Sequence, residues 1–468
     1  MLAIISDLHF CDGSATRKNV NPGAFELALG EIYALAVKVA RRRDQPTRVD
    51  LVLLGDVFDL LRTERWFEDR DGTPVPLAER PWGSEKALDP AAASPTVIAR
   101  AGLILDEILL ENAVALKMLR GESAPPPEGV EVRRIYLPGN HDRLYLHDAG
   151  LAARVRAALG AVAPSGLASE GIFQHRLEMP RYGLLARHGH EWDEWNFESF
   201  RDDAVPSEYT DQDYLPTPIG DPITTELAAR LPYELRRRLG DSSLVTPVEC
   251  EHIYHRMQRI EDVRPLLASF QWAYYEADRL GGTMRSTAAA EVRLVVDATV
   301  KDLAERFRQL DFYRAWLDKH SRDLQIDSAD LLQAALYGLS RVSLASGLSV
   351  ANRFDALLSR SEPRDDCRRG AAKEDLRTVG QRGLRFVVYG HTHSPLEVAL
   401  SASDGKSNVY LNSGTFRQGV FRTDDKSGFI GWERLTLLCF FAEDEIEGES
   451  DEARSGPAFS TRTGARAR

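Results

Sequence analysis

Five short motifs rich in His and Asp follow one another along this chain, and each comes after a short apolar run. The motifs are Asp7-Leu8-His9, Gly55-Asp56-Val57-Phe58-Asp59, Gly139-Asn140-His141-Asp142, His188-Gly189-His190 and Gly390-His391-Thr392-His393. They contain six of the eleven histidines. The apolar runs are typical of buried strands in a layered α/β core, where polar ligands gather beyond the carboxyl ends of the strands. The motifs therefore predict one shared site.

The residue types in the motifs favour a site for two metal ions. Imidazoles, carboxylates and one amide oxygen, with no thiolate, suit borderline-to-hard cations. A two-metal hydrolase needs several such ligands and one that bridges the ions. Asp56 is the candidate bridge, because the missing side chain of Gly55 lets this turn approach the metals closely. The predicted metal ligands are Asp7, His9, Asp56, Asn140, His188, His391 and His393.

His141 is the candidate for proton transfer. It directly follows Asn140, so its ring is expected near the metals without binding either of them. Asp59, at the end of the second motif, could fix the tautomer of that ring and raise its pKa, which suits a general acid. We therefore expect hydrolysis of a phosphate ester by attack of a metal-bridging hydroxide, with His141 protonating the leaving oxygen.

The ordered set of motifs resembles the calcineurin-like metallophosphoesterase family. The family pattern D-x-H, G-D-x-x-D, G-N-H-D/E, a lone H and G-H-x-H is present here without substitution. The resemblance implies an α/β fold of two mixed β-sheets packed face to face with flanking helices, an αββα sandwich. It also implies two metal-ligand sets that share Asp56. The first is Asp7, His9, Asp56 and His393, and the second is Asp56, Asn140, His188 and His391.

The rest of the chain predicts additions to this core. Residues 1–195 and 376–442 are assigned to the discontinuous core, and residues 61–94 to a long surface loop. Residues 196–375 show few strand signals and several amphipathic helical patterns, which predicts a largely helical insertion or cap. Residues 443–468 are acidic and then polar, which is typical of a disordered tail.

Three further residues near the motifs are candidates for substrate contact, each with a structural alternative. Arg143 could contact a phosphate oxygen or form a surface ion pair. His190 could line the substrate site or cap a turn. Trp192 could stack on a substrate ring or anchor the helical insertion, and the insertion is favoured because aromatic residues mostly bury area.

The identities of the metal and the substrate are less constrained. Mn²⁺ is favoured for both ions, with Fe and Zn open, since oxygen and nitrogen ligands discriminate weakly. The segment Asn412-Ser413-Gly414 after the last motif resembles the phosphodiesterase-like branches of the family, so a phosphodiester or a nucleotide is the expected substrate. The alternatives are a nuclease acting on DNA or RNA, and a non-catalytic metal-binding scaffold for a protein partner.

Composition bounds the remaining functions. The chain has 468 residues and a formal charge of −12, which argues against general attraction to nucleic acid. No apolar run approaches the ~20 residues that a membrane-spanning helix needs. The four cysteines form no CxxC pair, and no signal peptide precedes Asp7, so a cytoplasmic location is expected. These features leave the oligomeric state open.

Overall fold

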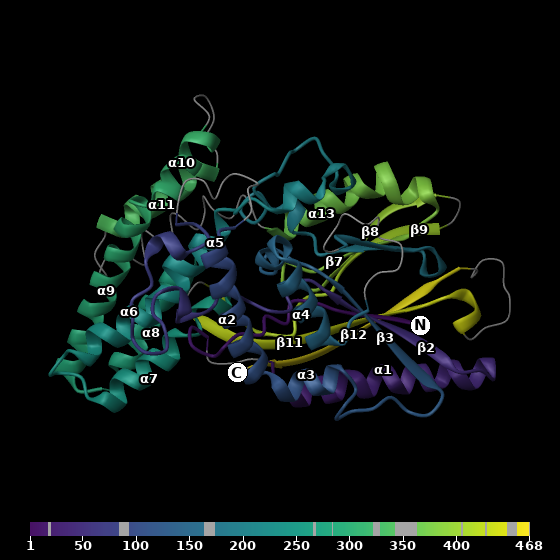
Figure 1. Ribbon diagram of the computed structural model, residues 1–468, viewed down its shortest axis with the longest axis horizontal. Helices are drawn as coiled ribbons and strands as arrows, with labels where there is room; N and C mark the ends of the chain where they lie inside the picture. The colour runs from purple at the N-terminus through teal and green to yellow at the C-terminus, as the bar shows by residue number, and fades with distance from the viewer. Residues whose placement is uncertain are drawn as a thin grey trace.

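The computed structural model describes residues 1–16, 20–83, 93–162, 174–264, 268–282, 284–321, 328–341, 363–403, 406–425, 428–446 and 456–467 (Figure 1). Its strands form two mixed sheets. The first has the order β3-β2-β1-β11-β10-β6, with β12 also paired to β11, and the second has the order β4-β5-β7-β9-β8.

The strands of the first sheet are β1 (Leu2–Ile5), β2 (Thr47–Leu54), β3 (Val130–Leu137), β6 (Val263–Arg264), β10 (Gln418–Arg422), β11 (Phe429–Phe441) and β12 (Ala458–Ala467). Those of the second are β4 (Arg176–Met179), β5 (Leu184–Arg187), β7 (Phe386–Tyr389), β8 (Leu396–Ser403) and β9 (Lys406–Asn412). The five apolar runs that precede the motifs correspond to β1, β2, β3, β5 and β7, as predicted.

The two sheets pack face to face. Leu2 and Ile4 of β1 belong to the same buried cluster as Ala186 of β5 and Val388 of β7. Helices α1 (Pro22–Arg43), α2 (Pro95–Glu111), α3 (Ala113–Leu119) and α4 (Ala149–Leu159) pack on the outer face of the first sheet, and α13 (Pro363–Glu374) packs on the outer face of the second (Figure 1). The expected arrangement of two mixed sheets with flanking helices is therefore confirmed.

The helical region over residues 95–119 is divided. Helices α2 and α3 are separated at Asn112, whose side-chain amide donates to the carbonyl oxygens of Cys11 at 3.0 Å and Ile108 at 2.8 Å. An Asn side chain that bonds backbone groups competes with a continuous helix. The break also ties these helices to the loop that follows β1.

The described residues within the range 196–375 are largely helical, as predicted. They contain α5 (Gly220–Pro222), a π-helical turn over Ile223–Ala229, α6 (Arg230–Gly240), α7 (Pro247–Met257), α8 (Ser269–Gly281), α9 (Ser286–Arg308), α10 (Asp311–His320) and α11 (Ser328–Arg341). The sequence pattern predicts the last of these helices over about residues 328–346, of which 342–346 lie outside the described residues.

The insertion is joined to the core more closely than its predicted limits suggest. The two-residue strand β6 pairs in parallel with β10 and so belongs to the first sheet. Helix α13 covers the second sheet, with Cys367 and Ala371 buried against Val387 and Tyr389. These apolar contacts make α13 part of the core layers, although it falls inside the range assigned to the insertion.

The prediction of a disordered tail over residues 443–468 is wrong for residues 456–467. Strand β12 pairs antiparallel with β11 from Ala458 to Ala467. The prediction was based on the polar composition of this segment. An edge strand can have such a composition, because only alternate residues of it need to be apolar. Phe459 packs beside Phe386 and Phe440 between the sheets.

The segment 61–94 was predicted to be a surface loop, but its described part, up to residue 83, contains buried anchors. Trp66 and Trp82 are 0% and 1% exposed. Their indole N–H groups donate to Leu60 O at 2.7 Å and to Glu226 Oε1 at 2.9 Å. The loop is therefore packed between the core and the insertion. Within the described part of the chain, every helix is too short or too polar to cross a lipid bilayer.

Candidate metal centre

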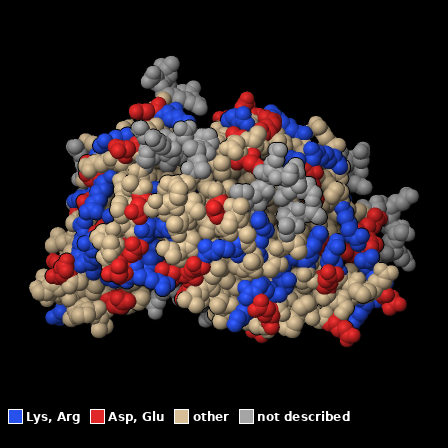
Figure 2. All heavy atoms as spheres, viewed as in Figure 1, with Lys and Arg blue, Asp and Glu red and all other residues tan. Residues whose placement is uncertain are grey.

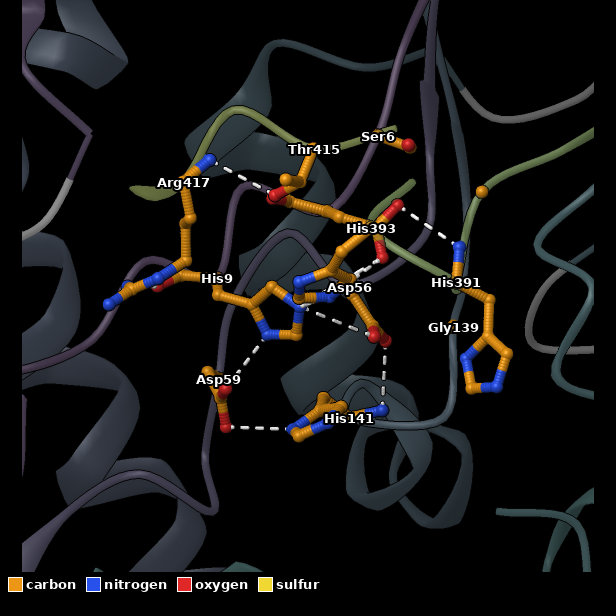
Figure 3. Close-up of polar contacts among 12 residues, drawn as sticks. Ser6, His9, Asp56, Asp59, Gly139, His141, His391, His393, Thr415 and Arg417 are labelled. Carbon is orange, nitrogen blue, oxygen red and sulfur yellow. Dashed lines mark hydrogen bonds and ion pairs between the residues drawn. The ribbon is translucent and has the colours of Figure 1, made fainter. Parts of the chain in front are cut away.

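The first, second, third and fifth motifs meet where the strands of both sheets end (Figure 3), and the fourth joins them through His188, whose Nε2 lies 3.2 Å from Asp56 Oδ2. The backbone N–H groups of Asp7 and His9 donate to Gly55 O at 3.1 Å and Asp56 O at 2.8 Å, which joins the loops after β1 and β2. The backbone N–H of His391, from the second sheet, donates to Asp7 Oδ2 at 3.1 Å. This last bond ties the two sheets together at the site.

Backbone strain is concentrated in the motifs. Asp7, His9, Asp56, His391 and His393 all have positive φ angles, between 43° and 67°. L-residues rarely adopt this left-handed region, and such strain gathers at functional sites. The one other non-glycine residue with positive φ in the described ranges is Asp44, which caps α1.

A first group of potential ligand atoms comes from Asp7, His9 and His393. The Nε2 atoms of His9 and His393 lie 2.9 Å apart, and His393 Nε2 lies 3.3 Å from Asp7 Oδ1. Asp56 Oδ2 is 3.6 Å from His9 Nε2. Two imidazole nitrogens and two carboxylate oxygens therefore point at one small volume.

A second group comes from Asp56, His188 and His391, whose ligand atoms lie within 4.8 Å of one another. His188 Nε2 is 3.2 Å from Asp56 Oδ2. The same Asp56 oxygen is the one closest to His9 in the first group, which is the position expected of a bridging ligand.

The donor atoms fit divalent metal ions. Asp7 Oδ1, Asn140 Oδ1 and His188 Nε2 are buried and make no hydrogen bond. Buried polar atoms normally have a hydrogen-bond partner, so these three atoms, each from a different motif, call for an additional partner. A Cβ on Gly55 would lie 2.2 Å from His188 Nδ1, and one on Gly139 would lie 2.2 Å from Asp56 Oδ1. Glycine is thus required where the loops close around the donors.

The histidine rings are oriented by bonds to their other nitrogens. His9 Nδ1 lies 2.8 Å from Asp59 Oδ2, and His188 Nδ1 lies 2.9 Å from Leu54 O. His391 Nε2 lies 3.0 Å from Asp193 Oδ2, which leaves Nδ1 as its metal-binding nitrogen. Such outer contacts are usual for metal-bound histidine. The role of Asp193 could not be recognised from the sequence, because this residue belongs to none of the motifs. It lies three residues after the end of the fourth motif.

His141 lies at the edge of the ligand cluster. Its Nδ1 is 3.0 Å from Asp59 Oδ1, and its backbone N–H donates to Asp56 Oδ1 at 2.9 Å. Burial lowers the pKa of His141, but the nearby carboxylates of Asp59 and Asp56 outweigh it and raise the pKa to about 9. The ring is also close enough to His9 and Asp56 to join a metal site. Its bond to Asp59 is the geometry expected of a general acid.

The electrostatics of Asp56 and His188 are linked. Burial opposes charge on both side chains, but His188 and His141 hold the pKa of Asp56 well below its usual value. Asp56 in turn raises the pKa of His188 to about 10 against the effect of burial. Asp56 thus favours a positive charge on His188. A bound metal ion would supply a positive charge to the same carboxylate.

Two of the candidates for substrate contact have packing roles. The buried guanidinium of Arg143 lies 2.7 Å from Asp221 Oδ2, and it also donates to Leu215 O at 2.9 Å. It joins the third motif to the insertion by a buried ion pair, where a surface ion pair was the alternative. Trp192 donates its indole N–H to Tyr389 Oη at 3.1 Å and packs against Gly370 of α13. Trp192 therefore anchors α13, which lies in the range assigned to the insertion but packs with the core layers.

His190 remains a candidate for substrate contact. It lines a narrow cavity beside Asn140, together with Phe197 and Tyr214. Its Nδ1 is buried and makes no hydrogen bond. Burial lowers the pKa of His190 to about 3, so the ring is neutral and can accept or donate one hydrogen bond.

Two buried arginines support the site, and neither is part of a motif. Arg62 Nε lies 2.8 Å from Asp59 Oδ2, and Arg62 Nη1 lies 3.6 Å from Asp262 Oδ1. Arg417 donates to His9 O at 2.8 Å and lies 3.1 Å from the same Asp262 oxygen. The sequence places Arg62 near the second motif, but nothing in it pairs either arginine with the distant Asp262.

Comparison with known proteins adds no family assignment: no protein-family model matches the chain, and no curated protein matches it.

Proposed function

We propose that this protein is a dinuclear metal-dependent phosphoesterase of the calcineurin-like metallophosphoesterase type. The observation that carries the proposal is the position of Asp56 Oδ2, which lies 3.6 Å from His9 Nε2 of the first group and 3.2 Å from His188 Nε2 of the second, with His141 held beside it by Asp59. A binding scaffold would need the ligands but would not need a histidine in this position.

Seven residues would hold the metals. One ion would be bound by Asp7, His9, Asp56 and His393, and the other by Asp56, Asn140, His188 and His391. Bound metal ions would lower the pKa of a water molecule and neutralise charge on the phosphate. The O/N donor set leaves Mn²⁺ as our first choice, with Fe and Zn as alternatives.

His141 supplies the proton in this proposal. Its Nδ1 faces Asp59, so Nε2 is the nitrogen that donates to the leaving oxygen. The pKa of about 9 belongs to the metal-free protein. Cations nearby disfavour a second positive charge, so metal binding would bring this pKa down toward the working pH. The Asp59 carboxylate stabilises the protonated ring until the proton is transferred.

As substrate we propose a phosphodiester or a nucleotide, on the resemblance of the Asn412-Ser413-Gly414 segment to the phosphodiesterase-like branches of the family. The cavity beside Asn140, with His190, Phe197 and Tyr214 in its wall, encloses only about 10 Å³. This is the space of one water molecule, so a substrate ring would lie outside this cavity. The nuclease alternative gains no comparable support, since acidic and basic side chains are intermixed on the face shown in Figure 2.

The test is hydrolysis of bis(p-nitrophenyl) phosphate beside p-nitrophenyl phosphate by protein reconstituted with Mn²⁺, Fe²⁺ or Zn²⁺. His141→Ala should reduce diester turnover by about 100-fold or more, whereas His252→Ala, at an exposed position on α7, should leave it unchanged. Turnover of the monoester alone would redirect the proposal to phosphatase substrates. Metal binding without turnover of either compound would favour the scaffold alternative.

A further inference from the structure

A second pocket, of about 360 Å³, lies where α7 and α8 of the insertion meet β10 and β11 of the first sheet. This volume is within the range of small-molecule sites in proteins. None of the seven proposed metal ligands lines it. Its described wall combines arginines from the insertion with aromatic rings from both parts of the chain.

The charged lining has more cations than anions. It contains Arg256, Arg259 and Arg279, against the two carboxylates of Asp262 and Glu276. Two of the arginines share one carboxylate: Arg256 Nη2 lies 2.6 Å and Arg279 Nε 3.5 Å from Glu276 Oε2.

Arg259 differs from the other two arginines in its contacts. Among the described residues, none forms a hydrogen bond or an ion pair with its guanidinium. Asp262, the carboxylate nearest in sequence, is already engaged by Arg417 at 3.1 Å and Arg62 at 3.6 Å. Burial lowers the pKa of Arg259 despite the presence of Asp262. A partly buried guanidinium of this kind would be stabilised by an anionic ligand.

The pocket also has an aromatic surface. Trp272 is almost fully buried in its wall, and the rings of Tyr275 and Phe429 are 5.5 Å apart. Tyr275 and Phe429 are only partly buried, so their ring surfaces are open to a ligand. An aromatic surface beside an arginine suits a ligand that carries a planar ring next to an anionic group.

Arg417 separates this pocket from the candidate metal centre. On one side it donates to the carbonyl oxygen of His9. On the other it contacts Asp262 and donates to Thr16 Oγ1 at 2.9 Å, and both of these residues line the pocket. In Figure 3 Arg417 lies beside His9, on the opposite side of the cluster from His391.

We infer that this pocket is a second ligand site, which binds a nucleotide by its phosphate at Arg259 and by its base at Tyr275 and Phe429. The inference does not depend on the proposed hydrolase activity, because no metal ligand takes part. Arg256 and Arg279, which share Glu276, would add to the attraction for the phosphate.

The experiment is a titration of the full-length protein with AMP, followed by calorimetry and by quenching of tryptophan fluorescence. It is done on the metal-loaded protein and again after treatment with EDTA. We expect saturable binding that survives removal of the metals. Arg259→Ala should weaken it about tenfold or more, the size expected for a lost charge-assisted hydrogen bond. Tyr275→Ala should weaken it as well.

The control is Arg314→Ala, which removes the same charge from a side chain that is 60% exposed on α10 and outside the pocket. It should bind AMP like the wild type, and thermal unfolding should show that all variants are folded. Loss of binding on EDTA treatment, or unchanged binding by Arg259→Ala, would overturn the inference. Equal affinity for inorganic phosphate would overturn the role of the aromatic rings, and equal affinity for adenosine would overturn the role of Arg259.

Discussion

The carboxylate of Asp59 lies between His141 and His9, with Oδ1 3.0 Å from His141 Nδ1 and Oδ2 2.8 Å from His9 Nδ1. Burial alone would raise the pKa of Asp59, but His141 and Arg62 outweigh it and hold the pKa well below its usual value. One ionised carboxylate therefore orients both a proposed metal ligand and the proposed general acid. We expect substitutions of His141, Asp59 and the candidate bridging ligand Asp56 to have different effects.

His141→Ala should reduce turnover by about 10²–10⁴-fold, the usual contribution of a general acid, and leave both metals bound. The metals stay because His9, Asp56 and the other ligands keep their contacts. Metal content of the purified variant, measured by atomic emission, separates this result from a loss of ligands. Loss of one metal per chain would show that His141 is itself a ligand.

Asp59→Asn should reduce both turnover and metal affinity. The amide has one accepting oxygen in place of two, so it cannot accept from both His141 and His9. Loss of an outer contact to a metal-bound histidine typically weakens metal binding about 10–100-fold. A competition titration with a metal-binding dye measures this directly. Metal affinity equal to that of His141→Ala would contradict the proposed role at His9.

Asp56→Ala should lose metal binding and stability together. Asp56 belongs to both ligand groups, accepts the backbone N–H of His141 and stabilises the charge on His188. Its removal leaves a buried histidine without its counter-ion, which costs about 3–5 kcal/mol for buried pairs. Thermal unfolding with and without Mn²⁺ should show a lower Tm and no stabilisation by metal. Thermal unfolding of Asp44→Ala, a substitution at the C-terminal cap of α1, is the control. It shows how the Tm changes when an aspartate away from the site is removed.

Much of the core could be predicted because its signals are local. The apolar runs before the fourth and fifth motifs are β5 and β7, since a buried strand is apolar throughout and stops where a polar motif begins. The candidate ligand residues could be predicted from the sequence for the same reason. Their positions at strand ends bring them together once the strands are parallel.

The elements that were missed depend on distant partners. Strand β12 exists because β11 offers it a paired edge, and β6 exists because β10 does. Asp193 orients His391, and Asp262 connects Arg62 with Arg417, but each pair is far apart in the chain. A polar residue in such a contact has no local pattern that distinguishes it from a solvent-exposed one.

Removal of residues 447–468 should destabilise the protein, although their composition resembles a tail. The truncation takes away β12, exposes the edge of β11 from Trp432 to Phe441 and uncovers the cluster around Phe440. Phe459→Ala, a milder change, should lower the free energy of unfolding by about 1–2 kcal/mol, since this ring is only partly buried. Urea unfolding monitored by circular dichroism measures both. A truncated protein with unchanged stability would show that the β11–β12 pairing contributes nothing.

Glu226 should make stability depend on pH in the acid range. Its carboxylate is buried, accepts the indole N–H of Trp82 at 2.9 Å and pairs with Arg80 and Arg230. Burial would raise its pKa, but the two arginines outweigh it and lower the pKa below 4.5. A lowered pKa means that this stabilisation is fully present above the unfolded value near 4.5 and is lost as the pH falls through the folded value.

Glu226→Gln should therefore cost about 3 kcal/mol near pH 7, the lower end for a broken buried ion pair, because Arg230 is partly exposed. Arg80 is buried, which lowers its pKa. The cost of burying this charge reduces the net contribution of the Arg80–Glu226 pair to stability. The difference from the wild type should shrink below pH 4.5, where the wild-type carboxyl group becomes protonated as well. Urea unfolding at several pH values between 3 and 7 gives this difference directly. A difference that stays constant over the range would mean that Glu226 acts through its hydrogen bonds and not through its charge.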